Sequence, residues 1–389
     1  MRITNVETFP LRLPADAAYL GVLPSGEEPP EAEYYVRPPW RSLYSHRYET
    51  MLVRLQAEDG TAGWGEALAP VGPEIPAQIV DLLLRPVLLG AHADRPRPVV
   101  AVLRGLMRER GHLVGHQADA IAAVDTALWD LAARVQGVSV VSLLGGAFRD
   151  EVPTYVSGLP RPDDAGRATL ALEWSDRGAT AVKLHLGHGV AQDLRTVDAV
   201  QAAAPALGVA VDAHWAYSLS EALTLVEGLA ARGAAFLEAP LAPEDIRGHA
   251  RLVERSGVPI AIGESLRNRY EFAQWLDAGA LQVAQPDVAR TGITELMAIA
   301  ELCSAAHVRV APHHSVGLTV AAAAGVAVSA AIEGLLLFEY QPTSLSIGAA
   351  ALGNPLTVTP SRMTVPTGPG LGIEVDRAVV QRLTKESER

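Results

Sequence analysis

The sequence predicts an α/β protein in which a (β/α) barrel is joined to an α+β capping domain. From about Val152 onwards, short β-rich runs alternate with longer helical patterns, which is the order expected of parallel strands connected by helices. Eight such runs are present, enough to close a barrel. The residues before them follow a different pattern, and 389 residues suffice for a large domain and a smaller one.

Residues 1–140 are predicted to form the capping domain. Met1 to Leu13 alternates like a strand, and two further β-rich runs flank the turn sequence Glu58-Asp59-Gly60-Thr61, as in a hairpin. Between them, residues 14–47 are too many for an idle connection, so this segment is predicted to be a functional loop. Helical patterns follow over Glu74–Leu89, Pro98–Arg110 and Gln117–Gln136.

The predicted barrel covers residues 150–355. Its strand-like runs are Pro153–Val156, Ala181–Leu186, Val209–Asp212, Ala235–Glu238, Ile260–Glu264, Leu281–Ala284, Val308–Ala311 and Leu335–Glu339. The longest apolar stretch, Leu318–Ile332, is rich in alanine and short for a membrane span, so a buried helix is predicted there. The tail, residues 356–389, has one strand-like stretch, Gly372–Val375, and is expected to return to the capping domain.

Composition narrows the classes of partner. The formal net charge of −12 argues against binding to nucleic acid or to an anionic membrane. An anionic substrate would therefore have to be bound by a local positive centre. The single cysteine, Cys303, excludes an intramolecular disulfide, and the N-terminus resembles no signal peptide, so a cytoplasmic location is expected.

Polar residues recur at the ends of successive predicted strands. They are Asp212, Glu238, Glu264, Asp287, His313 and Glu339, separated by 26, 26, 23, 26 and 26 residues. One strand, one helix and two loops take about that many residues, so each side chain occupies nearly the same position in its unit. Closure of the barrel would bring them together at its C-terminal mouth, where barrel enzymes have their active sites.

These residue types indicate a metal site beside an acid–base site. Asp212, Glu238 and Glu264 are oxygen donors that would repel one another without a cation, and such hard ligands favour Mg²⁺. An aspartate such as Asp287 fixes the tautomer of a neighbouring histidine and raises its basicity, which favours His313 as a base. The alternatives are strand-end carboxylates that cap helices and a structural histidine.

Further polar side chains are predicted to point into the barrel. Lys183 and His185 are two residues apart on one strand, so they share a face, as do Asp212 and His214. A lysine inside a barrel is costly unless it has a partner or a function.

These residues resemble the enolase superfamily, specifically its mandelate racemase-like branch, which has a modified TIM barrel. The resemblance covers nearly the whole chain. Arg54 to Glu66 and Ala123 to Gly146 are similar to the family's capping-domain signature, and the segments VDAHW, FLEAPL, IAIGES, QPDVARTGIT and APHH match strand by strand. The resemblance implies that Asp212, Glu238 and Glu264 bind Mg²⁺. It also implies that Asp287–His313 is the catalytic dyad and Glu339 the acid on the last strand.

One departure from the family's sequence pattern bears on which reaction the protein catalyses. Many relatives have Lys-x-Lys where this chain has Lys183-Leu184-His185, which weakens the case for two-base chemistry. In contrast, Asp212-Ala213-His214 resembles galactonate dehydratase-like members, in which that histidine protonates the leaving hydroxide. The resemblance therefore implies dehydration of an aldonate or aldarate to a 2-keto-3-deoxy acid, through α-proton abstraction and an enediolate. A racemase, an epimerase or a lactone cycloisomerase is the alternative, and a non-catalytic binding protein is a remote one.

Roles for the remaining groups follow from this mechanism. Lys183 would contact the substrate carboxylate, and a protonated Glu339 would donate a hydrogen bond to the enolate oxygen. By resemblance, the loop at residues 14–47 would close over the barrel mouth and determine specificity. The alternative is a surface loop or a subunit contact. The loop's predicted substrate-binding residues are Tyr34, Arg37, Trp40 and Arg41. The expected partners are a small carboxylate substrate and, because relatives are commonly symmetric assemblies, further copies of the chain.

Overall fold

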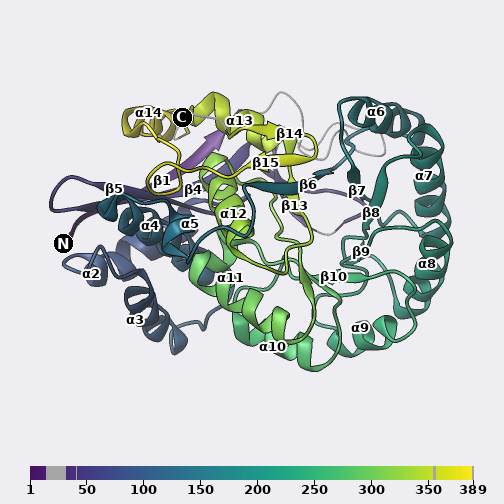
Figure 1. The fold of residues 1–389 in the computed structure, drawn as a ribbon, viewed down its shortest axis with the longest axis horizontal. Helices are drawn as coiled ribbons and strands as arrows, with labels where there is room; N and C mark the ends of the chain where they lie inside the picture. Colours follow the sequence, from purple (N-terminus) through teal and green to yellow (C-terminus); the bar gives the residue numbers. More distant parts are fainter. Residues whose placement is uncertain (15–31, 41, 354–355, 388–389) are drawn as a thin grey trace.

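The computed structural model describes residues 1–14, 32–40, 42–353 and 356–387. It has a capping unit built on an antiparallel sheet and a barrel ringed by helices (Figure 1). Both parts of the predicted fold class are confirmed. Arg41 and residues 15–31 of the predicted loop lie outside the described residues, so the predicted role of Arg41 is not addressed.

The capping sheet has the strand order β1-β4-β5, and a separate two-stranded ribbon, β2–β3, lies nearer the barrel. The strands are β1 (Ile3–Leu13), β2 (Tyr34–Val36), β3 (Leu43–Ser45), β4 (Tyr48–Ala57) and β5 (Ala62–Ala67). The hairpin prediction is confirmed, because β4 and β5 pair in antiparallel fashion around a turn in which Gly60 has a φ of 89°. That conformation favours glycine.

Helices complete the capping unit. They are α1 (Glu74–Ile79), a π-helical turn (Val80–Leu84), α2 (Arg85–Leu88), α3 (Pro96–Arg108), α4 (Gly115–Gln136) and α5 (Val140–Leu143). Helix α4 is buried along most of its length because it packs between the capping sheet and α11 of the barrel. Gly63 and Gly65 of β5 permit this close approach, since a Cβ at either position would collide with the backbone of α4.

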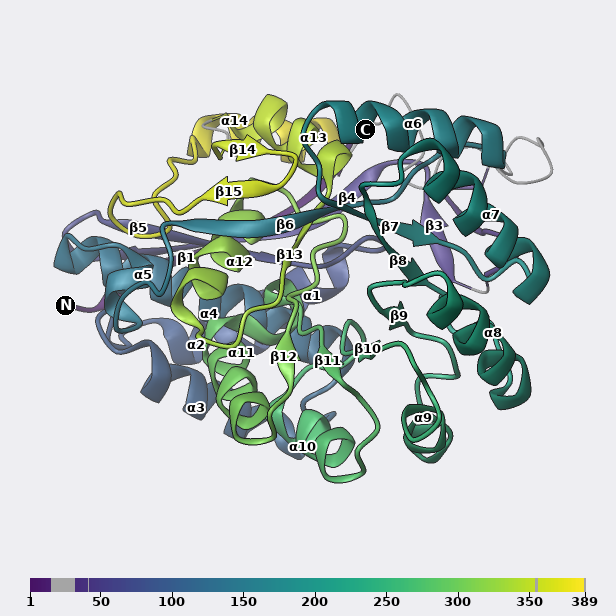
Figure 2. The same cartoon turned by 45° about the vertical axis from the view of Figure 1, so that its right-hand side comes forward.

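Parallel strands form the barrel, and helices surround it (Figure 2). The strands are β6 (Glu151–Ser157), β7 (Ala181–His185), β8 (Gly208–Asp212), β9 (Leu237–Glu238), β10 (Ile260–Ile262), β11 (Val283–Ala284), β12 (Arg309–Val310) and β13 (Phe338–Tyr340). The helices are α6 (Asp164–Asp176), α7 (Val190–Ala203), α8 (Leu219–Ala231), α9 (Ile246–Val253), α10 (Arg269–Asp277), α11 (Val288–Ala305), α12 (Thr319–Ala331) and α13 (Pro342–Leu352). The ring closes through parallel pairing of β13 with β6 and a bridge between Val310 and Leu335.

Inward-facing apolar side chains fill the barrel below its mouth: Tyr155, Ala210, Phe236, Ala261, Val283 and Ala311. The apolar stretch at 318–332 forms helix α12, which is buried throughout, as the sequence predicted. In the described part of the chain, no helix is long and apolar enough to cross a membrane.

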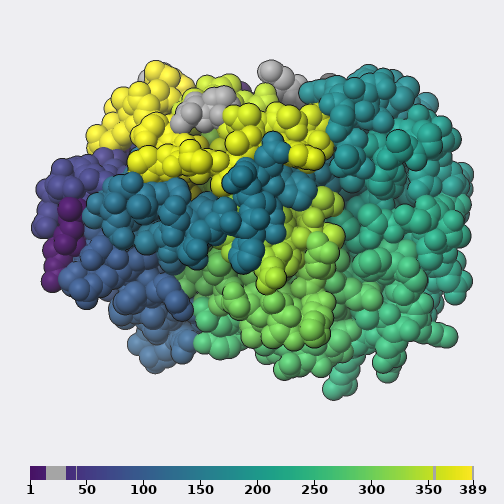
Figure 3. All heavy atoms as spheres, in the orientation of Figure 1, coloured from purple at the N-terminus to yellow at the C-terminus, as the bar shows by residue number. Residues whose placement is uncertain are grey.

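The C-terminal tail contacts both parts of the molecule. Its strands are β14 (Val358–Thr359) and β15 (Arg362–Thr364), and β15 pairs with β6. Its helix α14 (Arg377–Ser387) packs on β1, where Arg377 forms an ion pair with Glu7. Figure 3 shows the tail, in yellow, against the N-terminal part.

The strand predicted at Gly372–Val375 is wrong. Gly370 and Gly372 have φ values of 69° and 71°, which bend the chain, and no ladder forms over these residues. Gly370 instead exchanges main-chain hydrogen bonds with Val138 and Val140.

Candidate active site at the barrel mouth

The register of the barrel strands places the predicted metal ligands side by side. Asp212 is paired with His185 on one neighbouring strand and with Glu238 on the other. Glu264 follows β10 by two residues. Paired residues on adjacent strands lie only about 5 Å apart, so these side chains converge at the carboxyl ends of the strands.

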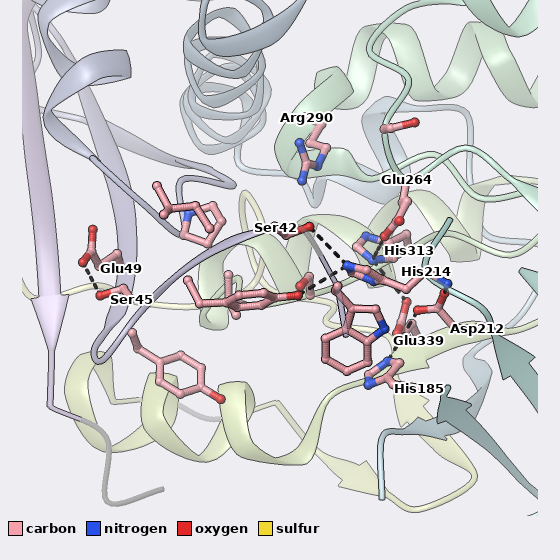
Figure 4. Close-up of a pocket in the computed structure, with 18 of the residues that line it drawn as sticks. Ser42, Ser45, Glu49, His185, Asp212, His214, Glu264, Arg290, His313 and Glu339 are labelled. Atoms are coloured by element: carbon pink, nitrogen blue, oxygen red, sulfur yellow. Dashed lines mark hydrogen bonds and ion pairs between the residues drawn. The ribbon is translucent and has the colours of Figure 1, made fainter. Parts of the chain in front are cut away.

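A cavity of about 330 Å³ lies between these strand ends and the capping unit. Asp212, Glu264, His313 and Glu339 line its barrel side, and residues around the β2–β3 ribbon line the other side (Figure 4). Its volume is at the lower end of the range of about 300–1,000 Å³ that is usual for small-molecule sites. Glu238 lies beneath the cavity and is fully buried.

Lys183 lies between two of the carboxylates. Its Nζ is 2.7 Å from Oε2 of Glu238 and 2.9 Å from Oε1 of Glu339, and its side chain is 1% exposed. Burial would raise the pKa of Glu339, but Lys183 and His313 lower it to about 2. Lys183 therefore forms ion pairs with two protein carboxylates, and these positive neighbours favour the ionised form of Glu339. The predicted contact of Lys183 with the substrate and the predicted hydrogen bond from a protonated Glu339 stay predictions.

The positive side chains at the barrel mouth do not fully neutralise its carboxylates. Burial, with repulsion from neighbouring carboxylates, raises the pKa of Asp212 to about 7 and that of Glu238 to about 8, although Lys183 acts in the opposite direction. Oε1 of Glu238 is buried and accepts no hydrogen bond from any residue that the structure describes. A buried oxygen without a partner is costly, so this donor set fits a bound cation.

His313 is held by Asp287, whose Oδ2 lies 2.7 Å from Nδ1 of the imidazole. The other ring nitrogen, Nε2, is 3.2 Å from Glu264 and faces the carboxylates. Burial lowers the pKa of His313, but Glu339, Asp287 and Glu264 outweigh it and raise the pKa well above its ordinary value. Ligand atoms of Glu238, Glu264 and His313 all lie within 4.8 Å of one another. Asp212 instead accepts a hydrogen bond from the main chain of His214.

His185 lies on the part of the cavity wall that is formed by β7 and β8. Its Nε2 is 3.5 Å from Oγ of Ser157 and 3.9 Å from Oδ2 of Asp212. Burial and the neighbouring Lys183 lower the pKa of His185 to about 3. A neutral imidazole is therefore the expected form of this side chain.

His214 contacts the β2–β3 ribbon. Its Nε2 is 3.3 Å from the hydroxyls of both Ser42 and Tyr44, and its ring lies 4.8 Å from that of Trp40. The indole of Trp40 donates a 2.9 Å hydrogen bond to the carbonyl of Leu186, which fixes the ribbon on the barrel. The capping unit therefore positions one histidine of the site.

The predicted substrate-binding residues of the loop are separated by the structure. Trp40 lines the cavity, but Tyr34 and Arg37 do not. The hydroxyl of Tyr34 donates to Glu49 and accepts from the main chain of Gly72, within the capping unit. Arg37 is 3% exposed and lies over the ring of Trp40, which it supports.

Tyr44 and Arg290 are among the cavity residues that the sequence did not predict. Tyr44 belongs to the short strand β3, in a segment that was assigned only as a loop. Arg290 lies three residues after Asp287, and this short spacing from a predicted site residue was the only signal for it.

Comparisons with known proteins agree with this geometry. Residues 166–379 match the model "Enolase C-terminal domain-like", and residues 37–145 match the mandelate racemase / muconate lactonizing enzyme N-terminal domain. The D-galactarolactone cycloisomerase of Agrobacterium fabrum is 33% identical over 86% of this chain and 91% of its own. The D-galactonate dehydratase of Ralstonia nicotianae is 31% identical over 85% and 90%.

A solved structure has the same fold. A racemase from Streptomyces coelicolor A3(2) with bound magnesium superposes with a TM-score of 0.85 at 26% identity, over 98% of this chain and 99% of its own. These relatives carry names for three different reactions. The chain belongs to the mandelate racemase/muconate lactonizing enzyme group of the enolase superfamily.

Proposed function

We propose that this protein is a Mg²⁺-dependent acid-sugar dehydratase that removes the α-proton of a sugar acid and expels the β-hydroxyl as water. The observation that carries the proposal is that two of the imidazoles lining one cavity, those of His313 and His214, are each held by a different partner. A β-elimination requires a base at one carbon and an acid at the next. The dehydratase relatives support the same reaction.

Asp212, Glu238 and Glu264 would hold the metal ion, because Mg²⁺ prefers oxygen ligands. This choice leaves His313 available for proton transfer. When bound, Mg²⁺ supplies Lewis-acid stabilisation of the negative charge that develops as an α-proton is removed. The unpartnered Oε1 of Glu238 and the raised pKa values of Asp212 and Glu238 support this assignment.

His313 is the proposed base. Because Nδ1 is occupied by Asp287, the nitrogen that accepts the substrate proton is Nε2, which faces the cavity. Asp287 is itself fixed by a 2.8 Å hydrogen bond from the main chain of Ala289, so the imidazole has one preferred orientation. Nε2 also contacts Glu264 in this structure, so it would become available to accept a proton when Glu264 is engaged as a metal ligand.

His214 is the proposed acid. Its hydrogen-bond distances of 3.3 Å to Ser42 and Tyr44 are longer than usual, so a substrate hydroxyl can replace either contact at little cost. Trp40, whose ring is tilted by 46° against the imidazole, keeps the imidazole in place during that exchange. His214→Asn is expected to slow loss of water while still permitting exchange of the α-proton with solvent.

A cycloisomerase is the second candidate, favoured by the similarity to the Agrobacterium fabrum enzyme. The same two histidines would serve, but the leaving oxygen would belong to a ring. The product would then be an isomer of the substrate, because no water is released. A racemase receives less support, because its second base would have to be His185, whose surroundings lower its pKa to about 3.

The test is incubation with a library of open-chain sugar acids and their lactones in deuterated water with Mg²⁺. A product lighter than its substrate by one water, from an open-chain acid, supports the dehydratase. An isomeric product from a lactone alone would replace it with the cycloisomerase. Deuterium at the α-carbon of otherwise unchanged acid would indicate racemisation, and absence of any reaction would favour a binding protein.

A further inference from the structure

The cationic side chains that line the cavity differ in how they are engaged. Among the described residues, the lysine and arginine side chains on its wall are Arg47, Lys183 and Arg290. Lys183 is held by Glu238 and Glu339. Arg47 is an exposed residue of the capping unit. Arg290 is therefore the candidate for a cation that is both sheltered and available to a ligand.

The guanidinium of Arg290 has no partner among the residues that the structure describes. Its Nε is sealed from solvent and makes no hydrogen bond, and the side chain forms no ion pair with any residue in the described part of the chain. Figure 4 shows it on the same side of the cavity as Glu264, with its nitrogens directed toward the space between the barrel and the capping unit. Burial, together with the nearby Arg267, lowers the pKa of Arg290, whereas surrounding carboxylates raise it.

The backbone around Arg290 is rigidly placed. Arg290 lies in the first turn of α11, where its N–H donates to the carbonyl of Asp287. Two residues later, Gly292 has a φ of 74° and interrupts the helix. Asp125 of the capping unit then accepts hydrogen bonds from both N and Oγ1 of Thr294. The turn that carries Arg290 is thus fixed relative to the dyad at both ends.

Such a group selects a particular ligand chemistry. An arginine is always charged and presents a planar array of donors that matches a carboxylate in two parallel hydrogen bonds. With a net charge of −12, the chain offers no general attraction for a dianion, so a second negative group needs its own local partner. An unpaired guanidinium on the cavity wall provides one.

We infer that Arg290 binds the second carboxylate of a dicarboxylic sugar acid, so that the substrate is an aldarate or the lactone of one rather than an aldonate. This inference rests on the proposed function, in which the metal ligands hold the carboxylate next to the reacting carbon. Arg290 is then the residue that determines which class of sugar acid is accepted.

The test compares aldarates and aldonates of the same chain length and stereochemistry, such as galactarate and galactonate, in the Mg²⁺-loaded protein. The wild type is expected to have the higher kcat/KM for the dicarboxylate. Arg290→Gln should lower that value about 10²-fold and change the value for the monocarboxylate by less than about threefold, as expected when one charged bidentate contact is lost. Arg290→Lys should give a kcat/KM for the dicarboxylate between those of wild type and Arg290→Gln. Lysine retains the charge but cannot form two parallel hydrogen bonds with a carboxylate.

Arg47→Gln is the matched control, since it removes another arginine that lines the same cavity. It is expected to affect both substrates alike. The inference would be overturned by any of three results. The wild type could prefer aldonates, Arg290→Gln could lower kcat/KM equally for both substrates, or Arg47→Gln could lose the preference for the dicarboxylate. Unchanged thermal unfolding of Arg290→Gln would confirm that folding is intact, as expected for a side chain without described protein partners.

Binding provides a readout that does not depend on turnover. In a His313→Asn background, calorimetry should give tighter binding of the dicarboxylate, and adding Arg290→Gln should abolish the difference. If no sugar acid or lactone reacts, the proposed function fails, and the binding assay still decides the inference. Selective dicarboxylate binding that depends on Arg290 supports it, and equal binding of both acids contradicts it.

Discussion

Two groups of buried carboxylates can be compared in the described part of the protein, one where the capping unit meets the barrel and tail, the other at the barrel mouth. At the first, Glu66 accepts hydrogen bonds from the main chain of Leu318 and Ala321, at the start of α12. Asp125 and Asp130 likewise accept main-chain N–H groups of segments distant in sequence. At the mouth, carboxylates instead face one another and Lys183, and Oε1 of Glu238 has no described partner.

Burial alone does not separate the two groups. It raises the pKa of Glu66 and of Asp125 to about 7, much as it does for Asp212. The difference lies in the partners. A buried carboxylate surrounded by N–H donors is satisfied by the protein and docks one unit on another, whereas a carboxylate surrounded by carboxylates requires a cation from outside.

The largest expected effect is at Glu238. Glu238→Gln should lower kcat/KM for the sugar acid by about 10³-fold or more, because Lewis-acid stabilisation contributes several kcal/mol. Calorimetric titration with Mg²⁺ should give much weaker binding, with thermal unfolding of the metal-free protein little changed.

Glu66→Gln is the matched variant at the interface. It should leave the affinity for Mg²⁺ unchanged and lower the unfolding temperature. The distinction between the interface carboxylates and the mouth carboxylates would be lost if the wild type stayed active after thorough chelation. It would also be lost if Glu238→Gln and Glu66→Gln lowered the Mg²⁺ affinity equally.

The next effect concerns the base at the mouth. His313→Asn should reduce both α-proton exchange and product formation by at least ~10²–10⁴-fold, the usual contribution of general acid–base catalysis. NMR in deuterated water measures the exchange, and calorimetry should show that Mg²⁺ still binds. Asp287→Asn should have an intermediate effect, because it disturbs the base without removing it.

His185→Asn is the control on the opposite wall of the cavity, with a modest effect expected on binding or turnover. If His185→Asn abolished α-proton exchange while His313→Asn retained it, His185 and not His313 would be the base.

At the interface, truncation should reduce stability rather than chemistry. Asp130 accepts hydrogen bonds from the main chain of Trp64 and Leu371 and from Arg134. Asp130→Ala leaves these buried donors without an acceptor, so the free energy of unfolding should fall by about 3 kcal/mol. Denaturant titration measures this loss. The kcat/KM of the folded fraction should stay within about threefold of wild type, and a specific loss of catalysis would contradict the structural role.

A pH dependence is expected at Asp125. Burial raises the pKa of this group from 3.8 to about 7, against the hydrogen bonds from Thr294, so the folded protein favours the protonated form. Its contribution to stability is therefore present below pH 3.8 and is lost as the pH rises toward 7. In Asp125→Asn the side-chain amide still has an oxygen that accepts hydrogen bonds, gains an NH₂ donor, and carries no charge at any pH in this range. Its stability relative to wild type, measured by denaturant titration, should increase from about pH 4 to about pH 7, and a constant difference would contradict the shift.

The sequence predicted the part of the site that follows from strand spacing. Near-constant intervals of 26 residues put Asp212, Glu238 and His313 at strand ends, and parallel pairing then brings them together. Loop residues obey no such period. Tyr34 therefore could not be distinguished from Trp40 as a cavity residue, although Trp40 lines the cavity and Tyr34 does not.

Partnership between side chains is a second property that sequence does not reveal. Whether Arg290 has a partner depends on where neighbouring elements place their side chains, and among the described residues it has none. The misassigned strand at Gly372–Val375 has a similar origin. Its β-like composition was overridden by two glycines whose positive φ angles turn the chain toward Val138.

The most direct test of the contrast between the two groups is anomalous diffraction from crystals soaked in Mn²⁺, a substitute for Mg²⁺ that scatters anomalously. One strong peak is expected among Asp212, Glu238 and Glu264, and none beside Glu66, Asp125 or Asp130. Absence of a peak at the mouth under saturating Mn²⁺, or an equal peak at the interface, would contradict this expectation.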